Sequence, residues 1–164
     1  MRVTVCELPD GRSELDERWP ALAAHCRERA SEFVLLPEMP FSPWLASSDE
    51  ADQNAWMSAV VAHESWQKAL VELGAGIVGG TSPIIDQGEN FNEAFVWSRT
   101  GGARGVHRKY YLPDEEGFWE ARWYQRGPRQ FVPTDAGALR IGFLVCTEMW
   151  FTEHARGYAG KGVN

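Results

Sequence analysis

Residues 32–41 read EFVLLPEMPF, and the place of this stretch between two helical patterns decides the fold class. Phe33 to Leu36 form a short apolar run that is typical of a buried strand. Pro37 ends the run, because proline cannot donate a backbone hydrogen bond to a neighbouring strand. The sequence therefore predicts that Glu38 stands just past the end of a strand.

A helical pattern lies on each side of this strand. Residues before it recur at spacings of four, three and four, which places them on one face of a helix that ends near Ala30. They are Leu15, Trp19, Leu22 and Cys26. Pro20 lies within this pattern, so the helix either starts there or is kinked there. Residues 47–73 open with serine and aspartate capping candidates and close at Gly74, which predicts a second helix.

Further strand patterns extend this alternation. Each is a short run of β-branched or aromatic residues, and a Gly-containing turn at residues 99–102 joins the last two into a hairpin. The runs are residues 1–8, 75–85, 92–98 and 103–109. Residues 110–131 resemble a loop with one helical turn at residues 119–123. The order β-α-β-α-β-β-β-loop-β-α predicts an α/β fold built as a layered sandwich.

Length and charge limit the classes of protein to consider. The chain has 164 residues, enough for one domain with its own core, and 16 basic against 23 acidic residues give a net charge of −7. We therefore expect no nucleic-acid partner. Apolar runs are far shorter than the roughly 18 residues that span a bilayer, and the N-terminus has no signal-peptide pattern. We expect no membrane partner, a cytoplasmic location and three reduced cysteines.

Residues 140–151 read RIGFLVCTEMWF and raise the question of what Cys146 does. Residues 141–145 predict a strand buried on both faces, with Cys146 at its carboxyl end. Ligand-binding crevices open at such strand ends in α/β folds. The alternative is an inert, buried structural cysteine, because free cysteine is among the most buried residue types.

Two further strand ends carry residues that a reactive cysteine needs. Glu38 and Lys109 each follow a predicted strand, although each alone is more typical of a solvated surface charge. Together with Cys146 they supply a general base, an ammonium that lowers the thiol pKa and stabilises an oxyanion, and a nucleophile. The three residues therefore form a candidate catalytic group.

The contexts of these residues resemble a known family. The segments "PE", "RK-x-x-L-P" and "VCTEMWF" are similar to those around the Glu-Lys-Cys triad of the nitrilase superfamily, the carbon–nitrogen hydrolases that include N-carbamoyl amidases and β-ureidopropionases. The resemblance implies a four-layer α-β-β-α sandwich, a thioester intermediate and release of ammonia or an amine. It also implies a small amide or carbamoyl substrate, homo-oligomerisation, and no cofactor or metal.

The resemblance assigns further residues one by one. The segment GFWEARWYQRG resembles that carrying a second glutamate in the N-carbamoyl branches, which places that glutamate at Glu120. Glu116 is the competitor, because aliphatic amidases carry a glutamate before a Gly-aromatic pair. Thr147 would offer its backbone N–H to the oxyanion, and Asn92 matches a family asparagine of structural rather than catalytic role. The role of Glu148 stays open between charge packing, helix initiation and catalysis.

Aromatic residues make up 12% of the chain and suggest either an aromatic core or a pocket wall. The candidates for substrate binding besides Thr147 are Trp123, Tyr124 and Trp150. Such walls would suit a substrate with an apolar or cationic tail.

Relatives of this family continue well past their nucleophile. Residues 1–164 are therefore expected to form the N-terminal portion of a carbon–nitrogen hydrolase domain, with its C-terminal part missing. Two alternatives follow: a catalytically inactive member that serves as an assembly partner, and a nitrile-hydrolysing relative. A redox or metal protein is a third reading, which would depend on Cys146 and scattered histidines, although no metal-ligand spacing emerges.

Overall fold

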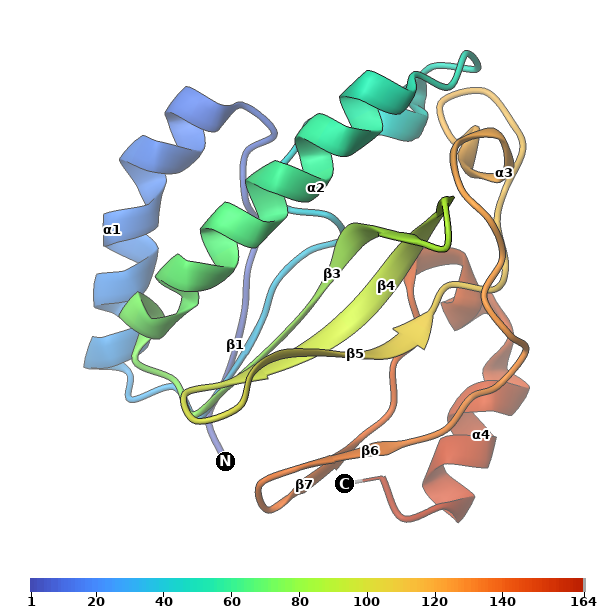
Figure 1. The fold of residues 1–164 in the computed structure, drawn as a ribbon. Coiled ribbons are helices and arrows are strands. Elements are labelled where there is room, and N and C mark those ends of the chain that lie inside the picture. Colours follow the sequence, from blue (N-terminus) through green and yellow to red (C-terminus); the bar gives the residue numbers. More distant parts are fainter. Residues whose placement is uncertain (164) are drawn as a thin grey trace.

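Five strands form one mixed sheet in the computed structural model, which describes residues 1–163 (Figure 1). Neighbours in the sheet follow the order β1-β2-β3-β4-β5, in which β1, β2 and β3 are parallel and β3, β4 and β5 are antiparallel. Their bounds are Val3–Val5, Phe33–Leu35, Ile77–Asp86, Glu89–Ser98 and Gly102–Arg108. The strand predicted at residues 33–36 is thus the second of the sheet.

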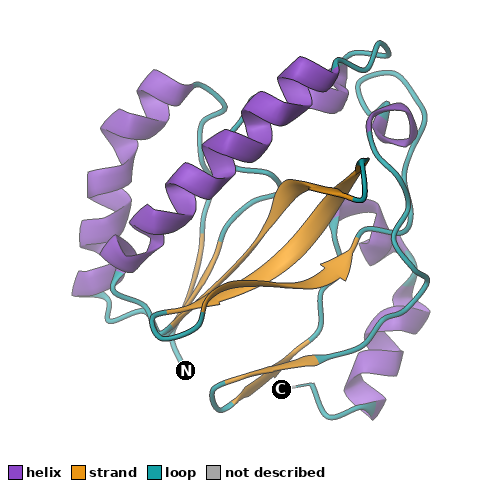
Figure 2. Ribbon diagram, viewed as in Figure 1, coloured by secondary structure: helices purple, strands orange, loops and turns teal. Residues whose placement is uncertain are grey.

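Helices α1 and α2 cover one face of this sheet, and a small second sheet lies on the other side with α4 (Figure 2). The second sheet pairs β6 with β7 in antiparallel register. The bounds of these elements are Arg12–Glu28 for α1, Gln53–Gln67 for α2, Thr134–Ala136 for β6, Leu139–Ile141 for β7 and Thr152–Gly160 for α4. The predicted α/β fold is confirmed, with its layers in α-β-β-α order.

Shorter helical turns complete the chain. A four-residue helix, α3, spans Glu120–Trp123, where one helical turn was predicted. Three 3₁₀ helices follow other elements: η1 at Leu45–Ser47, η2 at Lys68–Leu73 and η3 at Cys146–Trp150. Helix η2 continues α2 and ends at Gly74, whose φ of 73° is the left-handed conformation that glycine adopts readily.

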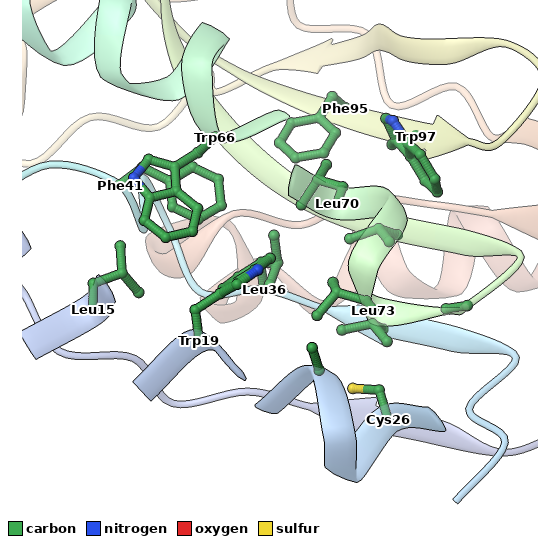
Figure 3. Packing of buried hydrophobic residues seen from close by; sticks show 14 residues of the cluster. Leu15, Trp19, Cys26, Leu36, Phe41, Trp66, Leu70, Leu73, Phe95 and Trp97 are labelled. Atoms are coloured by element: carbon green, nitrogen blue, oxygen red, sulfur yellow. The ribbon is translucent and has the colours of Figure 1, made fainter. Parts of the chain in front are cut away.

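The main core lies between α1, α2 and the helix-covered face of the sheet (Figure 3). Trp19 packs edge-on against Trp66, and Trp66 stacks on Phe41 at a ring-centroid distance of 5.3 Å. From β4, Phe95 and Trp97 join this cluster. Aromatic side chains bury the most apolar surface per residue, so these rings contribute much of the stabilisation of this layer.

The opposite face of β4 points toward the second sheet, because successive residues of a strand face opposite sides. Ala94 and Val96 pack there with Ala136, Phe143 and Val145. By the same alternation, Asn92 lies on this inner face.

Two local predictions are wrong. Residues 142–145 are not a strand, and β7 ends at Ile141, because the Val145 N–H bonds to a side chain, that of Glu148, rather than to a neighbouring strand. The prediction that the first helix starts at Pro20 is also wrong, since α1 begins at Arg12 and passes through the proline. Among residues 1–163, no helix combines the length and apolar character that crossing a bilayer requires.

Candidate active site

Glu38 is held in a turn directly after β2. The Leu36 N–H still bonds to the Gly79 carbonyl of β3, but Pro37 ends the pairing. Met39 then adopts a left-handed φ of 44°, and its N–H donates to Thr81 Oγ1 at 2.9 Å. A non-glycine residue in this conformation is uncommon, so the contact with β3 fixes a turn that the chain would otherwise disfavour.

Lys109 follows β5 and points toward the same region. The register of β4 and β5 shifts between Ala94 and Phe95, and the Lys109 N–H bonds to the Asn92 carbonyl at 3.0 Å. Such a bulge redirects the side chains beyond it. The neighbouring Arg108 instead pairs with Asp86 and Glu93.

The Lys109 ammonium lies between two carboxylates. Its Nζ donates to Glu38 Oε1 at 2.8 Å and lies 2.7 Å from both oxygens of Glu120. The Lys109 and Glu120 side chains are fully buried, whereas the Glu38 side chain keeps 19% of its surface exposed. One buried cation therefore joins the two glutamates, and Glu38 is the member of the group that solvent or a ligand can reach.

The charges of this group depend on one another. Burial lowers the pKa of Lys109, but the carboxylates of Glu38 and Glu120 outweigh burial and raise it. Burial and the charge of Glu38 raise the pKa of Glu120, against the opposing effect of Lys109. Lys109 is therefore a permanent cation near neutral pH, and it is the partner that makes a buried glutamate tolerable here.

Cys146 begins the 3₁₀ helix η3 in a strained conformation. Its φ of 49° is left-handed, which costs about 1–3 kcal/mol for a residue with a side chain. Burial, followed by the charge of Glu38, raises the pKa of its thiol, and Glu120 acts in the same direction. Lys109 and the backbone N–H of Thr147 lower it. The thiol is thus half-buried within the electrostatic field of all three charged residues, and it needs a base to become a nucleophile.

The residues predicted to bind substrate lie in different surroundings from one another. Tyr124 is buried with its hydroxyl against Glu120 and Asn92, and both burial and the nearby carboxylates raise its pKa. The Thr147 hydroxyl donates to the Tyr111 carbonyl at 2.7 Å. Trp123 lies in the core, where its indole N–H donates to the Ser48 carbonyl, and Trp150 is 79% exposed.

Of the two competing glutamates, Glu120 contacts Lys109, whereas Glu116 is exposed. Asn92 Nδ2 donates to Glu38 Oε1 at 2.6 Å, so the asparagine that was expected to be structural holds the carboxylate of the candidate base.

One partner of the site was missed. His107 is buried beside Glu148, and its Nε2 lies 2.8 Å from Glu148 Oε2. No local pattern in the sequence pairs His107 with Glu148, which are 41 residues apart. In the described part of the chain, no group of three or more histidine, cysteine or acidic residues is arranged to hold a metal ion.

Comparison with known proteins places the chain in a family. The sequence pattern of the carbon-nitrogen hydrolases matches residues 2–164, so the chain belongs to this family, as the nitrilase-superfamily resemblance predicted. A citrullinase from Francisella tularensis is 32% identical over 72 residues, which cover 44% of this chain and 25% of that protein. An omega-amidase from Xenopus laevis is 27% identical over 146 residues, which cover 86% of this chain and 52% of that protein.

Solved structures share the fold. A carbon-nitrogen hydrolase from Helicobacter pylori superposes with a TM-score of 0.77 at 22% identity, covering 99% of this chain and 56% of that one. An amidase from Nesterenkonia sp. gives a TM-score of 0.74 at 18% identity, covering 100% of this chain and 62% of that one. The chain thus spans 52% of the length of the Xenopus relative and 56% of the length of the Helicobacter protein.

Proposed function

We propose that the protein hydrolyses a small linear amide or N-carbamoyl compound through a thioester at Cys146. The observation that carries the proposal is the Lys109 ammonium, held by Glu38 at 2.8 Å and by Glu120 at 2.7 Å, within the same field as a half-buried thiol. The family and the relatives named citrullinase, omega-amidase and N-carbamoylputrescine amidase support this class of substrate. In a related Nesterenkonia structure, acrylamide has added to the active-site cysteine.

The first half-reaction forms the thioester. Glu38 accepts the thiol proton of Cys146 while the sulfur attacks the carbonyl carbon of the substrate. The negative charge that develops on the carbonyl oxygen is stabilised by the Lys109 ammonium and by the Thr147 N–H. The tetrahedral intermediate then breaks its carbon–nitrogen bond, and Glu38 returns the proton to the leaving ammonia or amine.

The second half-reaction restores the cysteine. Glu38, again a carboxylate, accepts a proton from water, and the hydroxide attacks the thioester carbon. The carbon–sulfur bond breaks, the proton returns to the sulfur, and the acid product leaves. Glu120 does not exchange protons in this scheme but keeps Lys109 charged and oriented between the two carboxylates.

A substrate panel tests the proposal. We expect the protein to release ammonia from one or more linear amides or N-carbamoyl compounds, and we expect Cys146→Ala to abolish that release. Iodoacetamide should inactivate the protein, with mass spectrometry locating the label on Cys146 rather than on Cys6 or Cys26. Ammonia release that survives in Cys146→Ala, or inactivation by a label elsewhere, would overturn the proposal. A nitrile panel run in parallel separates a nitrile-hydrolysing relative from an amidase.

A further inference from the structure

The carboxylate of Glu148 is buried and bonds to two separate backbone segments. The Tyr110 N–H donates to Glu148 Oε1 at 2.8 Å, and the Val145 N–H donates to Glu148 Oε2 at 2.8 Å. His107 Nε2 lies 3.0 Å from Oε1 and 2.8 Å from Oε2. The Glu148 side chain has no exposed surface, so these protein groups take the place of water.

The two segments are those that carry the ammonium and the thiol. Tyr110 directly follows Lys109 after β5, and Val145 directly precedes Cys146 at the start of η3. Each oxygen of the Glu148 carboxylate therefore accepts a hydrogen bond from a residue next to a reacting group. Oε1 accepts from Tyr110, beside Lys109, and Oε2 accepts from Val145, beside Cys146. The Thr147 hydroxyl, bonded to the Tyr111 carbonyl at 2.7 Å, ties the same two segments a second time. Figure 1 shows η3 beside the end of β5.

The same contacts support the strained backbone at Cys146. The left-handed φ of 49° persists only where the surroundings hold it. The Glu148 side chain bonds the N–H of Val145, and the Glu148 backbone N–H bonds the Val145 carbonyl at 3.1 Å, so both ends of the turn are closed on one residue. His107, near the end of β5, fixes the carboxylate from the side of the sheet.

We propose that Glu148 is a positioning residue that sets the Cys146 thiol relative to the Lys109 ammonium, with His107 as its support. This inference rests on the proposed function of the site, but it adds a group that does not touch the substrate. Its geometry requires two acceptor oxygens at once, because each faces a backbone N–H that can only donate. An amide of the same size provides one acceptor and forces its NH₂ group against the other N–H.

The test compares Glu148→Gln with Glu93→Gln. Glu93 also pairs with a side chain of β5, that of Arg108, at 2.9 Å, so its variant controls for the loss of a neighbouring carboxylate contact. We expect Glu148→Gln to fold and to lower kcat for ammonia release about 100-fold with KM changed less than threefold, since small misplacements of reacting groups cost rates of this size. We expect Glu93→Gln to lower kcat less than threefold.

A second readout does not depend on turnover. The rate of Cys146 alkylation by iodoacetamide, followed by mass spectrometry across pH, reports the combined effect of Glu38, Lys109 and Glu120 on the thiol pKa. Displacing the thiol from these charged groups should shift this profile in Glu148→Gln and leave it unchanged in Glu93→Gln. An unshifted profile in a folded Glu148→Gln, or equal loss of kcat in both variants, would overturn the positioning role.

Two variants of His107 cover the case in which Glu148→Gln does not fold. His107→Gln keeps an N–H donor for the carboxylate, whereas His107→Leu removes it. We expect His107→Leu to shift the alkylation profile away from that of wild type and His107→Gln to keep most of the wild-type behaviour, and identical profiles would count against the proposal. If wild type releases no ammonia from any compound but these profile shifts are observed, the proposed hydrolase function fails and the positioning role stands.

Discussion

The Asn92 amide donates a 2.6 Å hydrogen bond to Glu38 Oε1, the same oxygen that accepts from Lys109 Nζ at 2.8 Å. Two donors from the sheet thus hold one oxygen of a carboxylate that comes from a loop. Because Asn92 lies on β4 and Lys109 follows β5, the orientation of Glu38 is set by the antiparallel pairing of these strands. The Asn92 side chain therefore helps to orient the carboxylate of Glu38, the candidate base.

We expect Asn92→Ala to lower kcat for ammonia release about 10-fold, because Glu38 loses one of the two bonds that orient it. Loss of a buried hydrogen bond should also lower the free energy of unfolding by about 1–2 kcal/mol. Asn90→Ala is the matched control, since Asn90 lies on the same strand and bonds to Gln53 and the Trp123 carbonyl instead. Equal kcat values for the two variants would show that Asn92 does not orient the base.

Glu38→Gln should change hydrolysis and thiol acidity in opposite directions. The variant loses the base, so we expect ammonia release to fall at least 100-fold, the upper range of general-base effects being about 10⁴-fold. The charge of Glu38 raises the pKa of Cys146, so its removal should lower that pKa. Alkylation of Cys146 should therefore begin at lower pH in the variant than in wild type.

The measurement is the pH dependence of iodoacetamide labelling at Cys146, with labelling at Cys6 as an internal reference. Burial raises the pKa of Cys6 to about 12, and Cys26 acts in the same direction, whereas Glu38 has no part in that shift. Alkylation of Cys146 that moves to higher pH in Glu38→Gln would contradict the electrostatic arrangement described here.

Glu120→Gln and Glu116→Gln separate the two candidates for the supporting glutamate. Glu120 contacts Lys109 in the buried site, and Glu116 is exposed. Removing the Glu120 charge leaves Glu38 as the only carboxylate that bonds to Lys109 Nζ among the described residues. We expect Glu120→Gln to lower kcat at least 10-fold and Glu116→Gln to change it less than twofold, as measured by ammonia release. Similar activities of both variants would remove Glu120 from the mechanism.

Local patterns predicted most of the fold. The apolar run at residues 33–36 and the helical spacing of Leu15, Trp19 and Cys26 depend on neighbours along the chain, so they were visible in the sequence. The run at residues 141–145 was wrongly predicted to be one strand, because apolar character indicates that a segment is buried and not that its backbone pairs with another strand. Phe143 and Val145 are indeed buried, yet the Val145 N–H bonds to Glu148.

Contacts between distant segments were predictable only where the family resemblance supplied them. It brought Glu38, Lys109 and Glu120 together, and their catalytic roles stay predictions, as do the homo-oligomer and the cytoplasmic location. The pair of His107 and Glu148 depends on the bulge between Ala94 and Phe95 and on the turn at Cys146. Neither feature has a local signature, because each is set by how two segments meet in three dimensions.

His63 supports the loop of Glu38 from the helical layer. Its Nδ1 lies 2.8 Å from the Ala59 carbonyl, and its Nε2 accepts from the Phe41 N–H at 3.3 Å. These contacts require a neutral ring with the proton on Nδ1. Burial lowers the pKa of His63 from its ordinary value of 6.5 to about 4, although the backbone contacts act in the opposite direction.

This pKa shift predicts a dependence of stability on pH. Between pH 6.5 and about 4, the unfolded chain protonates His63 and the folded protein does not, so the contribution of His63 is complete above pH 6.5 and is lost as pH falls. The loss should reach on the order of 3 kcal/mol by pH 4. We expect the stability difference between wild type and His63→Gln, measured by urea unfolding, to change by this amount across that range. His25→Gln, at an exposed position of α1, is the matched control variant. A flat difference for His63→Gln would mean that the folded and unfolded chains protonate His63 with the same pKa.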